Sequence, residues 1–208
     1  MRDPGSQEAM RNEPATHAVD ELDRAREQEY ALLSTLLARC PDAAMIESLA
    51  GLQGNESPLG IAHAALGQAA ARTDPKEVQR EYFDLFSGLG RGGLLPYASY
   101  YLTGSLYGRP LARLRNVLQP LAIVPAEGQS EPEDHAAMLL EIMAGLAGGR
   151  IAAPLGTERE IFETHLAPWI GRFFADLEQT RPATFYAAVG GLGRVFTEIE
   201  IEAFRLPA

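Results

Sequence analysis

The sequence predicts an all-α protein, and three observations lead to that fold class. Apolar residues recur at spacings of three and four through most of the 208-residue chain, which is the period of an amphipathic helix. The alternation typical of a strand occurs in one stretch alone, VFTEIEIE at 195–202. Capping residues and prolines stand where several of the helices would begin. We therefore expect a single compact helical domain over 18–208, a bundle of about ten helices.

The N-terminal helices are marked by spacing and by proline. The first runs from Leu22 to Cys40 in steps of three and four, and Pro41 ends it because proline cannot continue a helix. A short helix is expected over 42–52. The turn-rich stretch QGNESP then separates it from an alanine- and leucine-rich helix over 58–72.

Three later helices are marked by capping boxes. In this pattern a side-chain oxygen at the N-cap and a carboxylate three residues later bond amides that the helix itself leaves unpaired. The boxes begin at Asp74, Ser130 and Thr157, and proline directly follows the first of them. Gly148 and Gly149 are expected to end the helix that begins at Ser130, since glycine is common at helix C-termini.

Proline marks the remaining helix starts, near Pro110, Pro168 and Pro182. The alternating stretch 195–202 belongs to a longer series of apolar residues spaced by three and four, so a helix is favoured over a strand there.

Two irregular stretches interrupt the helical pattern, near 87–98 and 120–130. We expect them to be joints between helical parts that share one core. Residues 1–17 lack the helical pattern and are expected to form a tail outside the fold.

Charge and cysteine content narrow the classes of function. Eighteen basic and twenty-eight acidic side chains give a net charge of −10, which disfavours nucleic acid as a partner because such binders need a cationic face. An acidic surface attracts cationic partners, although the same charge also keeps an ordinary protein soluble. The single cysteine, Cys40, forms no intrachain disulfide and holds no zinc ion by itself, so we expect a reducing compartment and no metal.

The sequence also lacks signals for membranes and export. Glu141 interrupts the best apolar run, which stays short of the roughly 20 residues that span a bilayer. The N-terminus has no apolar segment resembling a signal peptide. We therefore expect a cytoplasmic protein without stable membrane association.

The stretch FSGLGRGGLLPYASYY contains the pattern G-x-G-x-x-G at 88–93. A dinucleotide-binding loop needs a strand before the glycines and a helix directly after them. Here the preceding residues have a helical period, and Pro96 disfavours a helix immediately afterwards. We interpret the glycines as a helix end followed by a loop, and a nucleotide-binding hydrolase remains the alternative.

Asp134 and His135 stand beside glutamates in EPEDHAAMLLEIMAGL. An imidazole next to carboxylates can act as a general base or a metal ligand. No serine, threonine or cysteine nucleophile and no second histidine at i+4 accompany it, and a helix start disfavours a charged histidine. A non-catalytic role is therefore favoured, either packing at the base of a helix or binding.

The aromatic residues allow two interpretations. Trp169 follows Pro168 in a segment rich in phenylalanine, which is most simply core packing, and His165 would end the helix before it. Tyr97 and Tyr107 belong to a tyrosine-rich segment that lines either an apolar groove or the far wall of the core.

Several motifs, in order, resemble the TorD/DmsD-type (NarJ-like) chaperone family. They are EYFDLFSGLG, PYASYYLTGSLYGRPL, EPEDHAAMLLEIMAGL, HLAPWIGRFFADLE and TFYAAVGGL, and together they span most of residues 22–204. The E-P-x-D-H and H-L-x-P-W motifs are the most specific. One departure is visible, because Gly88-Leu89-Gly90 stands where the family often has Gly-Pro-Gly.

The resemblance implies a cytoplasmic helical chaperone that needs no cofactor and performs no reaction. It implies that the partner is the twin-arginine leader, and the apo form, of a molybdoenzyme such as a formate dehydrogenase or a DMSO/TMAO-type reductase. The chaperone would hold that enzyme until its cofactor is inserted. A monomer or a helix-exchanged homodimer would fit. The implied peptide-binding residues are Glu131, Asp134, His135, Tyr82, Phe86, Tyr97, Ser99 and Trp169.

The residue chemistry is compatible with that function. Carboxylates such as Glu131, Glu133 and Asp134 can bind guanidinium groups in strong bidentate hydrogen bonds. A groove lined by aromatic residues and leucine can accept an apolar segment as a helix. A third hypothesis is an acidic helical scaffold that binds another protein without any leader.

Overall fold

A computed structural model describes residues 19–87, 93–123, 131–181 and 184–206. Regular structure within those residues is helical, and no strand is present among them, which confirms the predicted all-α class. The expected tail at 1–17, residues 88–92 of the glycine motif and most of the joint at 120–130 lie outside the described residues.

The bounds of the elements follow in chain order. The α-helices are α1 Glu21–Ala38, α2 Ala43–Ala50, α3 Pro58–Arg72, α4 Pro75–Phe86, α5 Ala98–Thr103, α6 Arg109–Leu118, α7 Ala136–Ala147, α8 Thr157–Ile161, α9 Ala167–Glu178 and α10 Phe185–Arg205. A 3₁₀ turn, η1 Gln119–Leu121, follows α6, and a π-helical turn, η2 Phe162–Leu166, joins α8 to α9.

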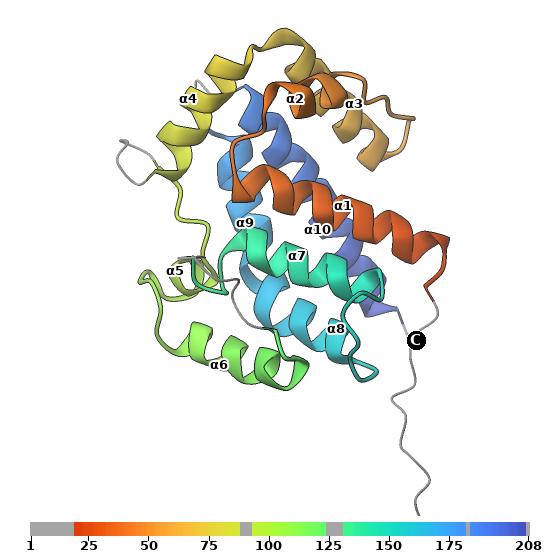
Figure 1. Ribbon diagram of the computed structural model, residues 1–208, viewed down its shortest axis with the longest axis vertical. Coiled ribbons are helices and arrows are strands. Elements are labelled where there is room, and N and C mark those ends of the chain that lie inside the picture. The colour runs from red at the N-terminus through yellow and green to blue at the C-terminus, as the bar shows by residue number, and fades with distance from the viewer. Residues whose placement is uncertain (1–18, 88–92, 124–130, 182–183, 207–208) are drawn as a thin grey trace, which may run out of the picture.

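The helices are arranged around α7, α9 and α10 (Figure 1). The α1 helix packs along α7, and α9 packs along α10. At one end of the molecule lie α2, α3 and α4, and at the other end lie α5 and α6 (Figure 1). The core between them is apolar; its largest fully buried side chains include Trp169, Tyr30, Tyr186, Phe162, Phe173 and Phe174.

Most helix bounds agree with the sequence prediction. The α3 helix covers Pro58–Arg72, the range expected for it. Asp74 caps α4 in a complete capping box, because its side chain accepts from the amide of Glu77 and that glutamate bonds the Asp74 amide in return. The stretch 195–202 lies within α10, so the helix chosen there over a strand is confirmed. Within the described residues no helix is both long and apolar enough to cross a membrane.

The helix predicted to begin at Ser130 begins six residues later. Residue 130 lies outside the described residues, and residues 131–135 form a turn rather than a helix. The N-cap of α7 is His135, whose ring accepts from the amide of Ala137. The predicted box fails because the Glu133 carboxylate bonds Arg115 of α6, at 2.7–3.0 Å, instead of returning to a cap amide. The predicted end at Gly148 is confirmed.

The capping box predicted at Thr157 is also absent. Thr157 is the first helical residue of α8, and the N-cap is Gly156 in the left-handed conformation with φ 88°. Glycine has no side chain to cap the helix, and its backbone carbonyl accepts the first helical hydrogen bond, from the amide of Glu160.

The helix break expected before Pro168 is replaced by a π turn. Residues 157–178 form one continuous helix in which the amide of Ala167 bonds the carbonyl of Phe162, five residues back. Proline has no amide hydrogen, so an α-helix here would lose one bond of its ladder. The longer π spacing accommodates that loss, and the Trp169 indole adds a bond at 2.8 Å to the carbonyl of His165.

The described residues around the glycine motif do not form a dinucleotide-binding unit. The helix α4, rather than a strand, precedes the glycines and ends at Phe86. Residues 94–97 after the motif are not helical, and α5, which the periodicity did not predict, begins at Ala98.

A buried ion cluster joins α1, α8 and α10. The Arg26 guanidinium bonds both carboxylate oxygens of Glu200, at 2.7–3.1 Å, and a carboxylate oxygen of Glu158 at 2.5 Å. The Tyr30 hydroxyl donates to Glu200 at 2.6 Å. We call these four residues the Arg26 cluster. Every Glu200 oxygen has a donor although the side chain is only 2% exposed, as a buried charge requires.

Candidate functional site

Five of the eight residues predicted to bind a peptide line one hollow with a volume of about 400 Å³. They are Tyr82, Phe86, Tyr97, Glu131 and His135. We call this cavity the acidic hollow. It is formed by α4, by the segment 95–97, and by the turn 131–135 with the start of α7. Ser87 and Glu131, which border the undescribed ranges 88–92 and 124–130, also line it.

An isolated antiparallel bridge brings two walls of the acidic hollow together. Tyr97 and His135 face each other in it. The amide of Ala98 donates to the carbonyl of Asp134 at 2.9 Å, and the amide of Ala136 donates to the carbonyl of Pro96 at 2.7 Å. The chain around Pro96 is extended, as expected next to a proline. The bridge therefore fixes the start of α5 against the start of α7.

His135 is a neutral side chain in this position. Its Nδ1 accepts from the Ala137 amide at 3.1 Å, so the ring proton is on Nε2. Burial lowers the pKa of His135, against the opposing effect of the Glu131 and Asp134 carboxylates. The ring packs edge-on against Tyr97, with 5.0 Å between the centroids. His135 is thus a helix cap and a wall of the hollow, with Nε2–H as its remaining donor.

Tyr97 orients the exposed carboxylate of Glu131 by donating its hydroxyl hydrogen to it. Burial and this hydrogen bond raise the pKa of Tyr97 above its ordinary value, so the phenol stays protonated. The remaining lone pairs of the Glu131 carboxylate lie at the edge of the hollow. Such a carboxylate can accept a guanidinium or ammonium group.

The α7 helix contributes two further residues that the sequence analysis missed. Met138 and Glu141 are the positions of α7 that are not buried, and both line the acidic hollow. They follow His135 at intervals of three, which places all three along one side of the helix. The sequence contained a signal for this position, because Glu141 is the one charged residue in a strongly apolar helix. The sequence analysis used it only to exclude a membrane span. Phe83, 55% exposed, and Leu106 are further lining residues that were missed.

Asp134 and Ser99 lie beneath the acidic hollow rather than in it. Both side chains are completely buried. An Asp134 carboxylate oxygen accepts from the Ser99 amide at 2.9 Å, and the Ser99 hydroxyl accepts from the Tyr107 amide at 3.0 Å. The other Asp134 oxygen has no hydrogen-bond partner among the described residues. In this structure the two residues position the joint between α5 and α7 and present no surface to a peptide.

Glu133 and Trp169 are occupied by other contacts. Glu133 bonds Arg115, which lowers the pKa of its carboxyl and leaves it unsuited to bind a partner's guanidinium, contrary to the expectation for this residue. Trp169 is fully buried in the core beside Tyr101 and Phe173. As a supporting residue it therefore stabilises the fold and does not line the hollow.

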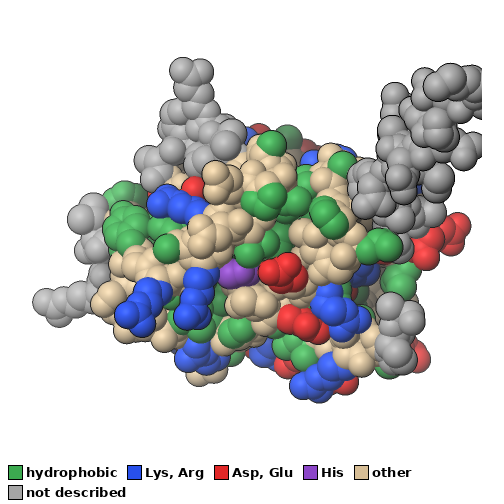
Figure 2. All heavy atoms as spheres, turned by 90° about the horizontal axis from the view of Figure 1, so that it is seen from below, with side chains coloured by type: hydrophobic (Ala, Val, Ile, Leu, Met, Phe, Trp, Pro, Cys, Tyr) green, Lys and Arg blue, Asp and Glu red, His purple; other side chains and the backbone are tan. Residues whose placement is uncertain are grey.

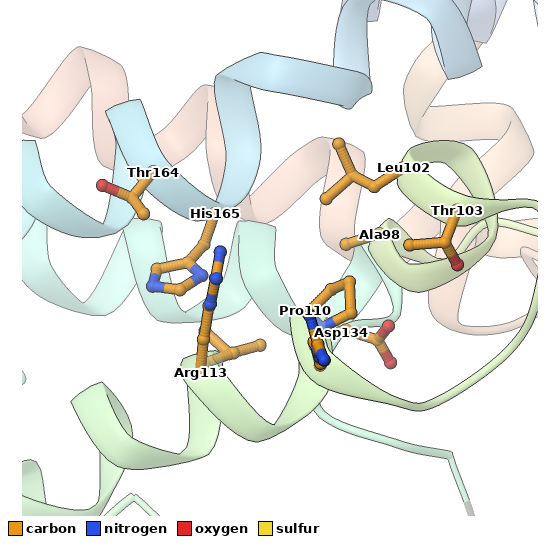
Figure 3. Close-up of a pocket in the computed structure, with 10 residues that line it drawn as sticks. Ala98, Leu102, Thr103, Pro110, Arg113, Asp134, Thr164 and His165 are labelled. Atoms are coloured by element: carbon orange, nitrogen blue, oxygen red, sulfur yellow. The ribbon is translucent and has the colours of Figure 1, made fainter.

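A second cavity, of about 340 Å³, lies on the other side of Asp134 between α5, α6 and η2. Figure 3 shows the Arg113 side chain beside the ring of His165 at this cavity. Burial lowers the pKa of His165. His165 was expected to end a helix, but it lies inside the continuous helix 157–178. On the underside of the molecule, basic side chains gather beside a histidine (Figure 2). None of the residues predicted to bind a peptide lines this cavity except Asp134.

Comparison with known proteins agrees with the motifs. The family model described as nitrate reductase delta subunit matches residues 53–175. The chaperone protein TorD of Vibrio cholerae O395 is 28% identical over 199 residues, covering 85% of this chain and 90% of the relative. TorD of Aliivibrio fischeri is 26% identical over 199 residues, covering 88% of this chain and 85% of the relative.

A solved structure of a redox enzyme maturation protein from Archaeoglobus fulgidus has a similar fold. The TM-score is 0.52 at 22% identity, and the match covers 83% of this chain and 93% of that chain. The match extends over most of both chains and supports the helical architecture. The curated relatives are named chaperones, not enzymes.

Proposed function

The chain belongs to the nitrate reductase delta subunit family, and from that premise we propose that it is a chaperone for the maturation of a redox enzyme. We propose further that it binds the twin-arginine leader of a molybdoenzyme in the acidic hollow. It would hold the apo-enzyme in the cytoplasm until cofactor insertion is complete. Binding and release require no bond to be made or broken, so the proposal needs no catalytic residues.

The observation that carries this proposal is the pairing of exposed carboxylates with apolar walls. Glu131 and Glu141 are both exposed, and neither takes part in an ion pair within the described residues. The apolar side chains of Phe83, Phe86 and Met138 line the same hollow. A twin-arginine leader has the matching chemistry, because two guanidinium groups precede an apolar segment.

The electrostatics of the hollow favour a cationic ligand. His135 is neutral, so it does not repel an arginine, and the Tyr97 phenol stays protonated beside Glu131. The net charge of −10 accelerates the encounter with a basic peptide, most strongly at low salt. Arginine is favoured over lysine wherever a carboxylate can accept two parallel hydrogen bonds.

The test is calorimetry with a client leader peptide and its Lys-Lys variant. We expect the Arg-Arg peptide to bind more tightly, and Glu131→Gln to weaken that binding by about tenfold, because the charge-assisted hydrogen bonds are lost. Phe86→Ala is expected to weaken both peptides equally, since it removes apolar contact alone.

Glu56→Gln provides the matched control, because it removes an exposed carboxylate in the turn before α3, away from the hollow. Thermal unfolding of each variant separates loss of binding from loss of folding. Equal affinity for the Arg-Arg and Lys-Lys peptides, together with unchanged binding by Glu131→Gln, would refute the leader-binding proposal.

A further inference from the structure

The second cavity, of about 340 Å³, has the features of a separate binding site. Its volume is at the small end of the range for ligand sites, which suits a side chain and its neighbours better than a large ligand. The apolar side chains of Leu102, Pro110 and Leu114 form part of its wall. Thr164 and His165 reach it from η2, and π turns occur frequently at functional sites.

The start of α6 carries positive charge where the helix itself disfavours it. Arg109 is the first residue of α6, and the N-cap Gly108 offers no side-chain cap. A cation at a helix N-terminus opposes the helix dipole, and Arg113, four residues later, adds a like charge on the same side. Both arginines are exposed and line the second cavity. Neither forms an ion pair or a hydrogen bond with a described residue, whereas Arg115 of the same helix pairs with Glu133.

Two buried polar side chains at this cavity also lack partners in the described part of the chain. His165 is 8% exposed, and its ring forms no hydrogen bond there although an imidazole has an N–H donor in either tautomer. The ring lies beside the Arg113 side chain (Figure 3). Asp134 is completely buried and has one unpartnered carboxylate oxygen. Because buried polar groups are normally hydrogen-bonded, the cavity fits an occupant that has both an acceptor and a donor.

We infer that the second cavity binds an acidic side chain of the client enzyme, in a segment where apolar residues flank it. The carboxylate accepts from Arg113 and His165, close to the uncapped start of α6, where anions are stabilised. The flanking apolar side chains contact Leu102 and Leu114. A backbone amide of the segment donates to Asp134, whose negative charge disfavours a free inorganic anion. The inference rests on the proposed chaperone function, and it gives the client a second contact of opposite charge to the acidic hollow.

The experiment titrates the full chain with two blocked peptides, one with a single glutamate between leucines and one with glutamine in its place. Calorimetry gives the affinities, and the NMR signals of the His165 ring report binding at the cavity. We expect the glutamate peptide to bind more tightly. Arg113→Gln should lower the ratio of the two affinities by about five- to tenfold, between the effect of an exposed ion pair and that of a charge-assisted hydrogen bond. Leu102→Ala should weaken both peptides equally, because it removes apolar contact alone.

Two further variants test whether the effect is local. Arg72→Gln removes the same charge from an exposed position at the end of α3, outside the cavity, and should keep the ratio. Glu160 is an exposed carboxylate near enough to His165 to act on its ring. Glu160→Gln should therefore tighten binding of the glutamate peptide by about twofold, because a nearby negative charge is removed. Thermal unfolding of each variant separates loss of binding from loss of folding.

Equal affinity of wild type for the two peptides, or no binding of either, would overturn the inference. An equal fall of the ratio in Arg72→Gln and Arg113→Gln would also overturn it, because the attraction would then come from overall charge. Inorganic phosphate is titrated alone as a third probe; if it binds through Arg113 while the glutamate peptide does not, the cavity is a free-anion site and the inference is wrong. Arg113→Gln should leave the Arg-Arg leader bound in the acidic hollow, so this inference and the leader-binding proposal fail separately.

Discussion

The Arg26 cluster and the acidic hollow use carboxylates in opposite ways. Glu200 is almost fully buried and receives donors from Arg26 and Tyr30 on its oxygens. Glu131 is exposed and accepts from the Tyr97 hydroxyl. The first region satisfies its charges within the fold and stabilises the packing of α1 on α10. The second keeps negative charge at the surface, where a partner can bind it. This acidic protein therefore contains carboxylates that are paired within the fold and carboxylates that remain open to a partner. Which of the two a carboxylate becomes depends on the hydrogen-bond donors that reach it.

Removal of Glu200 is the strongest test of this comparison. We expect Glu200→Ala to lower the free energy of unfolding by about 3–5 kcal/mol, because Arg26 would remain largely buried without its main counter-charge. Urea denaturation measures the change. Glu198→Ala is the matched control on the same helix, since its ion pair with Arg194 is exposed and should contribute at most about 1 kcal/mol. Similar losses in the two variants would contradict the distinction.

Asp134 tests an intermediate case, in which a buried carboxylate has one oxygen bonded and the other unpartnered. Asp134→Ala should cost about 1–3 kcal/mol of unfolding free energy, because the buried amide of Ser99 loses its acceptor. Asp134→Asn keeps an acceptor for that amide and should cost less. Urea denaturation measures the unfolding free energy of both variants. A larger loss of unfolding free energy for Asp134→Asn than for Asp134→Ala would contradict the assignment of Asp134 as a positioning residue.

The ion pair between Glu29 and His63 should have the smallest effect on the free energy of unfolding, and this effect should depend on pH. The Nε2 of His63 lies 2.9 Å from a carboxylate oxygen of Glu29, and this hydrogen bond raises the pKa of His63. A raised folded-state pKa contributes stability that is complete below the ordinary histidine pKa of about 6.5 and is lost as pH rises through the folded value. We expect less than about 1 kcal/mol, because the histidine is partly exposed.

The measurement for His63 is the difference in unfolding free energy between wild type and His63→Gln, followed from pH 5.5 to 8.5. The difference should shrink as pH rises. His135 and His165 have lowered pKa values, so they reduce stability as the pH falls. Wild type and His63→Gln both contain these two histidines, so their contribution cancels in the difference. A difference that grew with pH would show that the pair does not form.

Periodicity and capping patterns in the sequence were sufficient to predict the fold class and most helices. They succeeded where local chemistry decides the outcome, as at Asp74, whose cap needs residues from its own helix alone. They failed at Ser130, where the Glu133 carboxylate bonds Arg115 of α6, a partner that no local pattern contains. They failed at Thr157 for a local reason, because Gly156 takes the N-cap position.

The candidate site was predictable in part. The motifs that resemble the chaperone family identified residues from α4, the segment before α5 and the start of α7, and five of these meet at the acidic hollow. The motifs do not distinguish a residue that lines a cavity from one that supports it, so Asp134, Ser99 and Trp169 were grouped with the others although all three are buried. Glu141 was not predicted to line the site, because its exposure depends on which helices pack around α7.

The π turn between α8 and α9 sets the relative rotation of those two helices. Each residue of an α-helix advances the chain by about 100° around the axis, and a π turn accommodates one more residue than the α geometry would. Deleting a single residue from η2 would therefore rotate α8 by roughly that angle relative to α9. Glu158, which stands on α8, would then turn away from Arg26. The π turn therefore aligns Glu158 of α8 with Arg26 of α1, far away along the chain.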